Sequence, residues 1–299
     1  YQRVKGILNT MLELYDSKPL TKDNQLRLPK TQFSRLSKIQ QQTGDDCEWQ
    51  ETEWLKRKAE SLSHGKGIIK VKVPKNVKAT LRKYQQQGLN WLQFLSREDL
   101  SGILADDMGL GKTLQTLAHI QTEKNNGNMQ GPCIVIAPTT LLGNWFAEAS
   151  KFTPDLKLTY WAGSNRYASS DKLSQADLII TSYGLLLRDA DILNRQDLHL
   201  IILDEAQAIK NSSSKISKIV FTMQAKHRLC LTGTPLENHL GELWSLFHFL
   251  MPGFLGDESQ FKRLFRIPIE KEHDVSRQKE LADRIAPFML RRTKDKVAK

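Results

Sequence analysis

The sequence is poor in features of a disulfide-stabilised, metal-binding or membrane-embedded protein. Three cysteines and seven histidines are spread over 299 residues without an HExxH motif or a Cys/His cluster. Cys133 and Cys230 stand in short apolar runs, where a small buried hydrophobic side chain is the expected role. No run approaches the ~18 apolar residues of a membrane span, and the N-terminus lacks a signal-like apolar core. We expect no disulfide, no metal site built from these residues, no membrane partner, and a reduced intracellular compartment.

Acidic residues are missing from one long stretch. Lys and Arg number 44 against 33 Asp and Glu, a formal net charge of +11 with a pI near 9.5. Residues 61–97 contain no Asp or Glu. The basic residues there are Lys66, Lys70, Lys72, Lys75, Lys78, Arg82, Lys83 and Arg97. This excess predicts a strip that faces the phosphates of a polyanion, with a solvated basic face as the alternative.

The spacing of apolar residues differs between the first part of the chain and the rest. Apolar residues have helix-like spacing over residues 7–14, 33–42 and 49–62, whereas short apolar runs alternate with helical segments from Ala79 onward. The apolar segments cover residues 102–105, 133–138, 177–181, 198–205 and 227–233, and each leads into a polar or glycine-bearing stretch. Continuous apolar runs suit strands that are covered on both faces, and intervening helices suit parallel crossovers. We predict a basic, mainly helical extension over residues 1–75 and a doubly wound α/β domain over residues 76–299.

A glycine-rich motif follows the first apolar run. Residues 106–113 read DDMGLGKT and precede a helical segment. A strand, a glycine loop and a helix N-terminus direct backbone N–H groups at phosphate, while Lys112 would neutralise phosphate oxygens and the Thr113 hydroxyl would bind magnesium. Asp106 stands where the general GxxxxGK[ST] pattern has its first glycine. The context nevertheless favours a nucleotide-binding loop over a simple glycine turn capped by a surface lysine.

Two further motifs each follow directly after an apolar run, as the glycine-rich motif does. Asp204 and Glu205 could bind magnesium and deprotonate water, or could simply decorate a helix N-terminus. The Thr-Gly-Thr segment at residues 232–234 could hydrogen-bond the acidic pair, or could be an ordinary turn. Together with the glycine loop, the acidic pair predicts a nucleoside-triphosphatase.

A longer series of segments resembles the Swi/Snf-type ATPases of helicase-like superfamily 2. LRKYQ (81–85), with Gly88, Trp91 and Leu92, is similar to their adenine-recognising Q motif. The other similar segments are DxMGLGKT (106–113), IVIAPTTLLGNW (134–145), TSYGLL (181–186), LDEAQAIKN (203–211), LTGTPLENHLGELWSLFHFLMPGFLG (231–256) and PFMLRRTKDKV (287–297). Most family members have His at the position of Gln207. The DEAQ and AIKN segments resemble the bacterial branch more than the nuclear one.

The resemblance implies a RecA-like P-loop NTPase lobe, a parallel sheet flanked by helices, that uses ATP and Mg²⁺. Residues 284–299 would begin the linker to a second RecA-like lobe, with Arg291 and Arg292 serving the hinge. The implied catalytic residues are Lys112, Asp204 and Glu205, and the implied Mg²⁺ ligands are Thr113 and Asp204. The implied ATP-binding residues are Gln85, Asp107, Met108, Gly109, Leu110, Gly111, Lys112, Thr113 and Leu114. The implied coupling residues are Gln207, Thr232, Gly233 and Thr234, and the implied DNA contacts are Pro138, Thr139, Thr181, Ser182, Tyr183, Lys210 and Asn211.

The function implied by the resemblance is a DNA-dependent ATPase that translocates on duplex DNA and remodels or displaces DNA-bound protein. Its partners would be duplex DNA and the second lobe. Loss of the arginine finger that the second lobe supplies costs ~10³ to 10⁵ in turnover, so we expect the chain alone to be nearly inactive. We expect a cytoplasmic protein of the bacterial nucleoid, or a nuclear one in a eukaryote. Two alternatives stay open: a strand-separating helicase, and a nucleic-acid-binding regulatory module with a vestigial nucleotide site.

Overall fold

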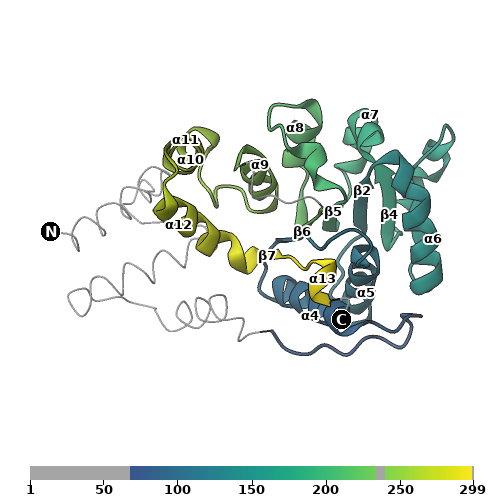
Figure 1. Cartoon of the computed structure of the whole chain (residues 1–299). Helices are drawn as coiled ribbons and strands as arrows, with labels where there is room; N and C mark the ends of the chain where they lie inside the picture. Colours follow the sequence, from purple (N-terminus) through teal and green to yellow (C-terminus); the bar gives the residue numbers. More distant parts are fainter. Residues whose placement is uncertain (1–67, 234–239, 298–299) are drawn as a thin grey trace, which may run out of the picture. The chain divides into compact units, whose positions relative to one another are not determined.

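The computed structural model describes residues 68–233 and 240–297 (Figure 1). The helical segments predicted before residue 68 and the predicted coupling residue Thr234 lie outside this range. The chain divides into two compact units. One unit spans Ile69–Leu250 and Phe288–Lys299 and carries the sheet, and the other includes Met251–Pro287.

Seven parallel strands form one sheet in the order β3-β4-β2-β5-β6-β1-β7. The strands are β1 (Gly102–Leu104), β2 (Cys133–Ala137), β3 (Leu158–Tyr160), β4 (Leu178–Ser182), β5 (Leu198–Leu203), β6 (Ala225–Leu231) and β7 (Met289–Leu290). Every residue of β1, β2, β4 and β5 is buried, as a parallel sheet covered on both faces requires. The predicted α/β sheet is therefore confirmed. The short edge strands β3 and β7 were not predicted.

Helices cover both faces of the sheet. The helices of this unit are α4 (Lys83–Arg97), α5 (Lys112–Asn125), α6 (Leu142–Phe152), α7 (Tyr183–Leu193), α8 (Lys215–Thr222) and α9 (Leu240–Leu250), with the short turns η3 (Thr139–Leu141), η4 (Arg166–Lys172) and η5 (Ala206–Ile209). One layer packs α4 on α5 and α5 on α6, and the other packs α7 on α8 and α8 on α9 (Figure 1). Fully buried Cys133 and Cys230 lie in β2 and β6 as free thiols.

The second unit is a short helical array. Its described elements are α10 (Glu258–Phe261), the π-helical turn η6 (Lys262–Arg266), α11 (Ile267–Glu272), α12 (Val275–Ile285) and η7 (Ala286–Phe288), which ends at the first residue of the sheet unit. Phe261, Phe265 and Leu281 form its buried side, and the Arg284 guanidinium stacks over the Phe265 ring. A last short helix, α13 (Lys294–Val297), follows β7. None of the helices described in either unit is long and apolar enough to cross a membrane.

Arg292 fastens the segment after β7 to the start of the glycine loop. Its guanidinium forms an ion pair with the Asp106 carboxylate, which is completely buried. It also donates hydrogen bonds to the Tyr84 carbonyl and to Gln115 Oε1, the latter at 2.7 Å. The expected role of Arg292 at a hinge stays a prediction; in this structure its side chain is held within the sheet unit. The Arg292 guanidinium therefore neutralises the buried Asp106 carboxylate and offsets the cost of removing that charge from water.

We predict that Arg292→Ala destabilises the sheet unit strongly. The substitution leaves the buried Asp106 carboxylate without its cation, and breaking a buried ion pair in this way costs ~3–5 kcal/mol of unfolding free energy. Urea denaturation followed by circular dichroism measures the loss. Lys296→Ala removes the same charge from an exposed residue of the same segment and should change stability by less than ~0.5 kcal/mol. Adding Asp106→Asn to Arg292→Ala should restore part of the loss, and no restoration would contradict the pairing.

Candidate nucleotide-binding site

Three loops meet at one edge of the sheet because the strands before them are neighbours. Leu104 in β1 pairs with Leu231 in β6, and Leu203 in β5 pairs with Cys230 in β6. The glycine loop, the acidic pair and Thr232 follow β1, β5 and β6 respectively. Parallel strands point their carboxyl ends to the same edge, which is where such sheets bind ligands. Motifs about a hundred residues apart in sequence therefore form one site.

The glycine loop has the backbone conformation that its glycines permit. Gly109 and Gly111 have φ of 84° and 75°, in the left-handed region that residues with a Cβ avoid. Gly111 also stands beside Gln85, whose Nε2 would lie 2.5 Å from a Cβ at that position. On the other side, a Cβ on Gly233 would come within 2.8 Å of the Met108 side chain. The absence of a side chain at Gly111 and at Gly233 therefore allows the glycine loop to pack closely between α4 and the end of β6.

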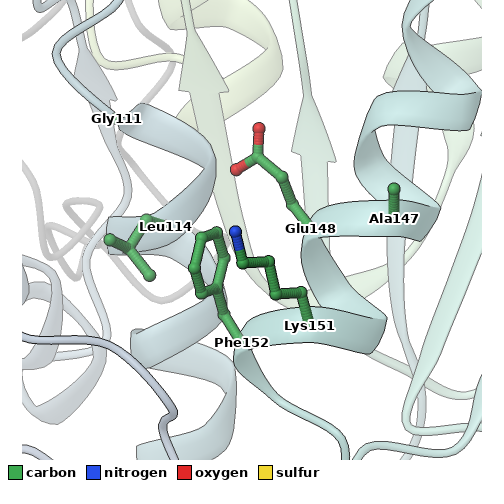
Figure 2. A pocket seen from close by; sticks show the side chains of 6 residues that line it. All are labelled: Gly111, Leu114, Ala147, Glu148, Lys151 and Phe152. Atoms are coloured by element: carbon green, nitrogen blue, oxygen red, sulfur yellow. The ribbon is translucent and has the colours of Figure 1, made fainter.

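A cavity of about 400 Å³ opens between the start of α5 and α6 (Figure 2). It is lined by Gly111, Leu114, Ala147, Glu148, Lys151 and Phe152. The lining combines an apolar floor with one carboxylate and one ammonium group. Burial and the nearby Asp204 raise the pKa of Glu148. The cavity thus adjoins the glycine loop and offers both apolar contact and hydrogen-bonding groups.

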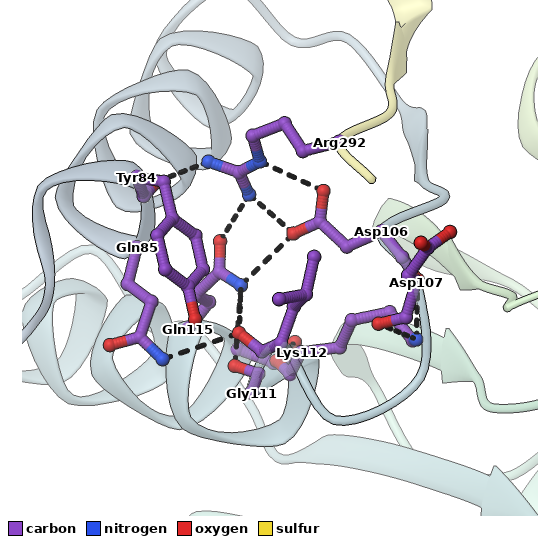
Figure 3. Close-up of polar contacts among 10 residues, drawn as sticks. Tyr84, Gln85, Asp106, Asp107, Gly111, Lys112, Gln115 and Arg292 are labelled. Atoms are coloured by element: carbon purple, nitrogen blue, oxygen red, sulfur yellow. Dashed lines mark hydrogen bonds and ion pairs between the residues drawn. The ribbon is translucent and has the colours of Figure 1, made fainter. Parts of the chain in front are cut away.

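Lys112 folds back on its own loop (Figure 3). Its Nζ donates to the Asp106 carbonyl at 2.7 Å and to the Asp107 carbonyl at 3.5 Å. Burial lowers the pKa of Lys112, against the opposing effect of Glu205 and Asp204. An incoming phosphate would exchange these two neutral acceptors for anionic oxygens, which form stronger hydrogen bonds with an ammonium group.

Gln85 holds the loop from the side of α4. Its Nε2 donates to the Leu110 carbonyl at 3.2 Å (Figure 3). Its Oε1 accepts from the Arg82 backbone N–H at 2.9 Å. Gln115, one turn into α5, joins the same network by donating to Asp106 Oδ2 at 3.2 Å. The predicted adenine-recognising residue therefore lies against the predicted phosphate loop, within a network that ends at Arg292.

Asp204 is held by three neighbours. Trp145 Nε1 donates to its Oδ2 at 2.7 Å, and the Glu205 backbone N–H donates to its Oδ1 at 3.0 Å. The Tyr183 hydroxyl donates to its carbonyl at 2.9 Å. Burial raises the pKa of Asp204, against the opposing hydrogen bond from Trp145. The fixed Asp204 carboxylate and the partly buried Thr113 hydroxyl are both hard oxygen donors, the kind of ligand that Mg²⁺ prefers.

Glu205 has a strained backbone and a well-defined partner. Its φ of 48° and ψ of 56° lie in the left-handed region, which costs a non-glycine residue ~1–2 kcal/mol. Gln207 Nε2 donates to Glu205 Oε2 at 2.8 Å, and Gln207 Oε1 accepts from the Thr232 hydroxyl at 3.3 Å. The amide at position 207 therefore donates and accepts at once, and it joins Thr232 to Glu205. Strain of this kind is characteristic of functional sites.

The candidate DNA-binding residues fall into two groups. Thr139, Lys210 and Asn211 are exposed on loops that follow β2 and β5. By contrast, Thr181 donates to the Trp161 carbonyl from a fully buried position, and Tyr183 is buried against Asp204. Ser182 caps α7 by accepting from the Leu185 N–H, and Pro138 is partly buried. The exposed three are the ones free to meet a partner from solvent.

Sequence reasoning missed the support around Asp204. Trp145 was recognised only as the last letter of a similar segment, and Tyr183 only as a candidate DNA contact. No local signal indicates that either side chain reaches Asp204, because both contacts join residues that lie far apart in the sequence. Polar ends on buried aromatic side chains are the signal that such a partner exists.

Comparison with known proteins agrees with this geometry. A family model described as SNF2-related domain matches residues 84–299. The TATA-binding protein-associated factor MOT1 of Saccharomyces cerevisiae is 44% identical over 250 residues, which cover 76% of this chain and 13% of MOT1. The chromatin-remodeling ATPase INO80 of Arabidopsis thaliana is 41% identical over 250 residues, covering 76% of this chain and 16% of INO80. The predicted bacterial branch stays a prediction.

A solved structure gives the same match. The Sulfolobus solfataricus SWI2/SNF2 ATPase core in complex with dsDNA superposes with a TM-score of 0.72 at 43% identity, over 76% of this chain and 47% of that chain. The chain thus spans less than half of that core and about one seventh of these curated relatives. The family match covers well over half of the chain. This chain belongs to the SNF2-related family and forms a RecA-like lobe of the SWI2/SNF2 ATPase type.

Proposed function

We propose that this chain is the ATP-binding lobe of a DNA-dependent ATPase that translocates on duplex DNA and remodels or displaces DNA-bound protein. The main support is that Lys112, Asp204 and Glu205 lie at the same edge of the sheet, after β1 and β5, the two strands that flank β6, and interact electrostatically there. Two further supports are the chromatin-remodelling name of a relative and the dsDNA bound by the Sulfolobus core. Work on duplex DNA would locate the protein in a bacterial nucleoid or a eukaryotic nucleus.

The residues of the site would divide the work of ATP hydrolysis. Gln85 would read adenine, the backbone from Gly109 to Thr113 would enclose the phosphates, and Lys112 would neutralise the γ-phosphate. The cavity beside Gly111 would take the nucleoside, with Glu148 and Lys151 as partners for its hydroxyls. Thr113 and Asp204 would hold Mg²⁺, which supplies charge neutralisation on the phosphates.

Glu205 would act as the base. Its carboxylate is positioned by Gln207 and would accept the proton of the attacking water at Oε1, the oxygen that Gln207 leaves free in this arrangement. Thr232, through Gln207, would report on movement of the loop after β6. A second RecA-like lobe would supply the arginine finger and close the site.

DNA would bind at the loop edge rather than along the basic strip. Lys210 and Asn211 follow the acidic pair after the single short turn η5, so a contact there would be close in sequence to Glu205. The part of the strip around Lys75 lies elsewhere: the neighbouring Asn76 donates to Asp155 and contacts Asn125 at the end of α5, whereas the glycine loop is at the start of that helix. We therefore propose phosphate contacts through Thr139, Lys210 and Asn211.

The first prediction from the proposed function concerns nucleotide affinity. Lys112→Ala removes a charge-assisted contact to phosphate, which is worth ~1.5–3 kcal/mol, so the dissociation constant for ATP should rise ~10- to 100-fold. Fluorescence titration of this chain with a fluorescent ATP analogue measures it. Lys157→Ala changes an exposed lysine before β3 and should leave the affinity unchanged. Equal affinity for all three proteins would remove Lys112 from the phosphate site, and a lack of ATP binding by the unaltered chain would indicate a vestigial nucleotide site.

The second prediction separates stability from catalysis at Glu205. Glu205→Gly relieves the left-handed backbone, so the unfolding free energy should rise by ~1 kcal/mol, while loss of the base lowers ATP turnover by ~10²- to 10⁴-fold. Turnover is measured in a polypeptide that carries both lobes. Asp99 also has positive φ, 54°, and lies outside the site. Asp99→Gly should therefore leave turnover unaltered; a Glu205→Gly protein with normal turnover would remove Glu205 from the mechanism.

The third prediction locates DNA. Lys210→Glu should weaken duplex affinity and reduce the slope of log K against log salt by ~1, because one phosphate contact is lost. Lys75→Glu makes the same charge change on the exposed strip and should leave the slope unchanged. Fluorescence anisotropy with labelled duplex at several salt concentrations decides between them. The opposite pattern would move the DNA to the strip.

Strand separation is the remaining alternative within the family. A displacement assay with the same two-lobed polypeptide and a labelled partial duplex distinguishes it from translocation on intact duplex. Release of a strand during ATP turnover would support the helicase function.

A further inference from the structure

A second cluster of polar side chains lies at the opposite end of α5 from the glycine loop. Glu123 stands in the last turn of α5, His199 near the start of β5, and His227 in the third position of β6. Because Lys112 and Glu123 begin and nearly end one helix, they are separated by eleven residues, or ~16 Å along the axis. This cluster is therefore outside the nucleotide site.

The three side chains converge in a buried space. Glu123, His199 and His227 expose 2%, 1% and 5% of their surface, so all three are more than nine-tenths buried. One ligand-type atom from each lies within 4.8 Å of the others. His199 Nε2 is 3.3 Å from Glu123 Oε2, and Ser96 Oγ lies 2.9 Å from the same carboxylate oxygen and 3.5 Å from His227 Nε2.

The protein partners of the cluster leave it incompletely satisfied. The Nδ1 atoms of both His199 and His227 are buried without a hydrogen-bond partner in the described part of the chain. The Nε2 atoms are the ones that face Glu123 and Ser96, so they are the nitrogens that a metal ion would use. Each Nδ1 would then carry the ring proton, so the site is supported by the convergence of the Nε2 atoms and the carboxylate and not by the unpaired Nδ1 atoms.

We propose that Glu123, His199 and His227 form a binding site for a divalent transition-metal ion, with Zn²⁺ as the best fit. Two imidazoles and one carboxylate are a ligand set that zinc commonly takes. Bonds of ~2.0–2.2 Å place tetrahedral ligands ~3.4 Å apart, so the 3.3 Å between His199 Nε2 and Glu123 Oε2 already fits. The ligand atom of His227 lies within 4.8 Å of the other two and would have to move closer to them. A water molecule or the Ser96 hydroxyl would complete the tetrahedron.

The ion would join parts of the lobe that hydrogen bonds now join weakly. It would link the C-terminal end of the P-loop helix to the starts of two central strands, β5 and β6, whose other ends carry Asp204 and Thr232. The three ligands are close together in the folded chain but not in the unfolded chain. Metal binding would therefore increase the free energy of unfolding. The proposed role is structural, at the far end of the elements that build the nucleotide site.

The test measures metal retention and stability together. The full chain, kept in excess Mg²⁺, is loaded with ZnCl₂, dialysed, and analysed by plasma mass spectrometry. We expect one zinc per chain and a rise in Tm of ~5–10 °C at a free Zn²⁺ concentration ~100 times the dissociation constant. Glu123→Gln, His199→Gln and His227→Gln should each weaken zinc binding by more than ~100-fold. His119→Gln alters a neighbouring buried histidine that contacts Gln93 and is outside the ligand set, and should keep affinity within about tenfold.

A measurement on the unaltered chain keeps the result decisive if a variant fails to fold. Zinc-edge X-ray absorption should show two imidazole ligands and one carboxylate. No retained zinc and no rise in Tm would overturn the proposal. So would an absorption spectrum without imidazole ligands, or ligand variants that fold and bind zinc as tightly as His119→Gln.

Discussion

The ion pair between Arg292 and Asp106 is the contact on which the arrangement of the glycine loop depends. Asp106 is fully buried at the point where β1 ends and the loop begins, and an unpaired carboxylate there would be very costly. Arg292 comes from the segment after β7, and it also reaches Tyr84 and Gln115. One guanidinium therefore ties α4, α5, β1 and the C-terminal segment together. The loop that departs from the general P-loop pattern at Asp106 compensates for that departure from 186 residues away.

Asp204 and Glu205 are also positioned by residues that lie far from them in the sequence. Asp204 is oriented by Trp145 and Tyr183, which come from α6 and the start of α7, while Gln207 connects Glu205 to Thr232 after β6. These elements cover both faces of the sheet. A change in the loop after β6 would therefore reach the base through a single amide. That short path gives a physical meaning to the replacement of His by Gln, since either side chain can donate and accept in one bridge.

Sequence patterns predicted much of the fold and the chemistry, but not the contacts between elements. Five strands were placed to within a few residues because each is a continuous apolar run followed by a polar loop. β3 and β7 were missed because edge strands of two or three residues have no such run. Lys112, Asp204 and Glu205 were selected from local motifs, and their catalytic roles stay predictions. The contact of Arg292 with Asp106 was not predicted, since the sequence around Arg292 contains no sign of Asp106.

The three-residue cluster of Glu123, His199 and His227 also could not be predicted from local sequence. Scattered histidines without local spacing predicted no metal site, and the criterion is sound for motifs within one helix or loop. Glu123, His199 and His227 come instead from a helix end and two strand starts, and only the parallel order of β5 and β6 brings them together. Strand adjacency also creates the nucleotide site at the other edge. In this fold, the order of the strands brings together both the nucleotide site and the Glu123–His199–His227 cluster. The partners of a polar residue at either end of a central strand therefore cannot be read from its local sequence.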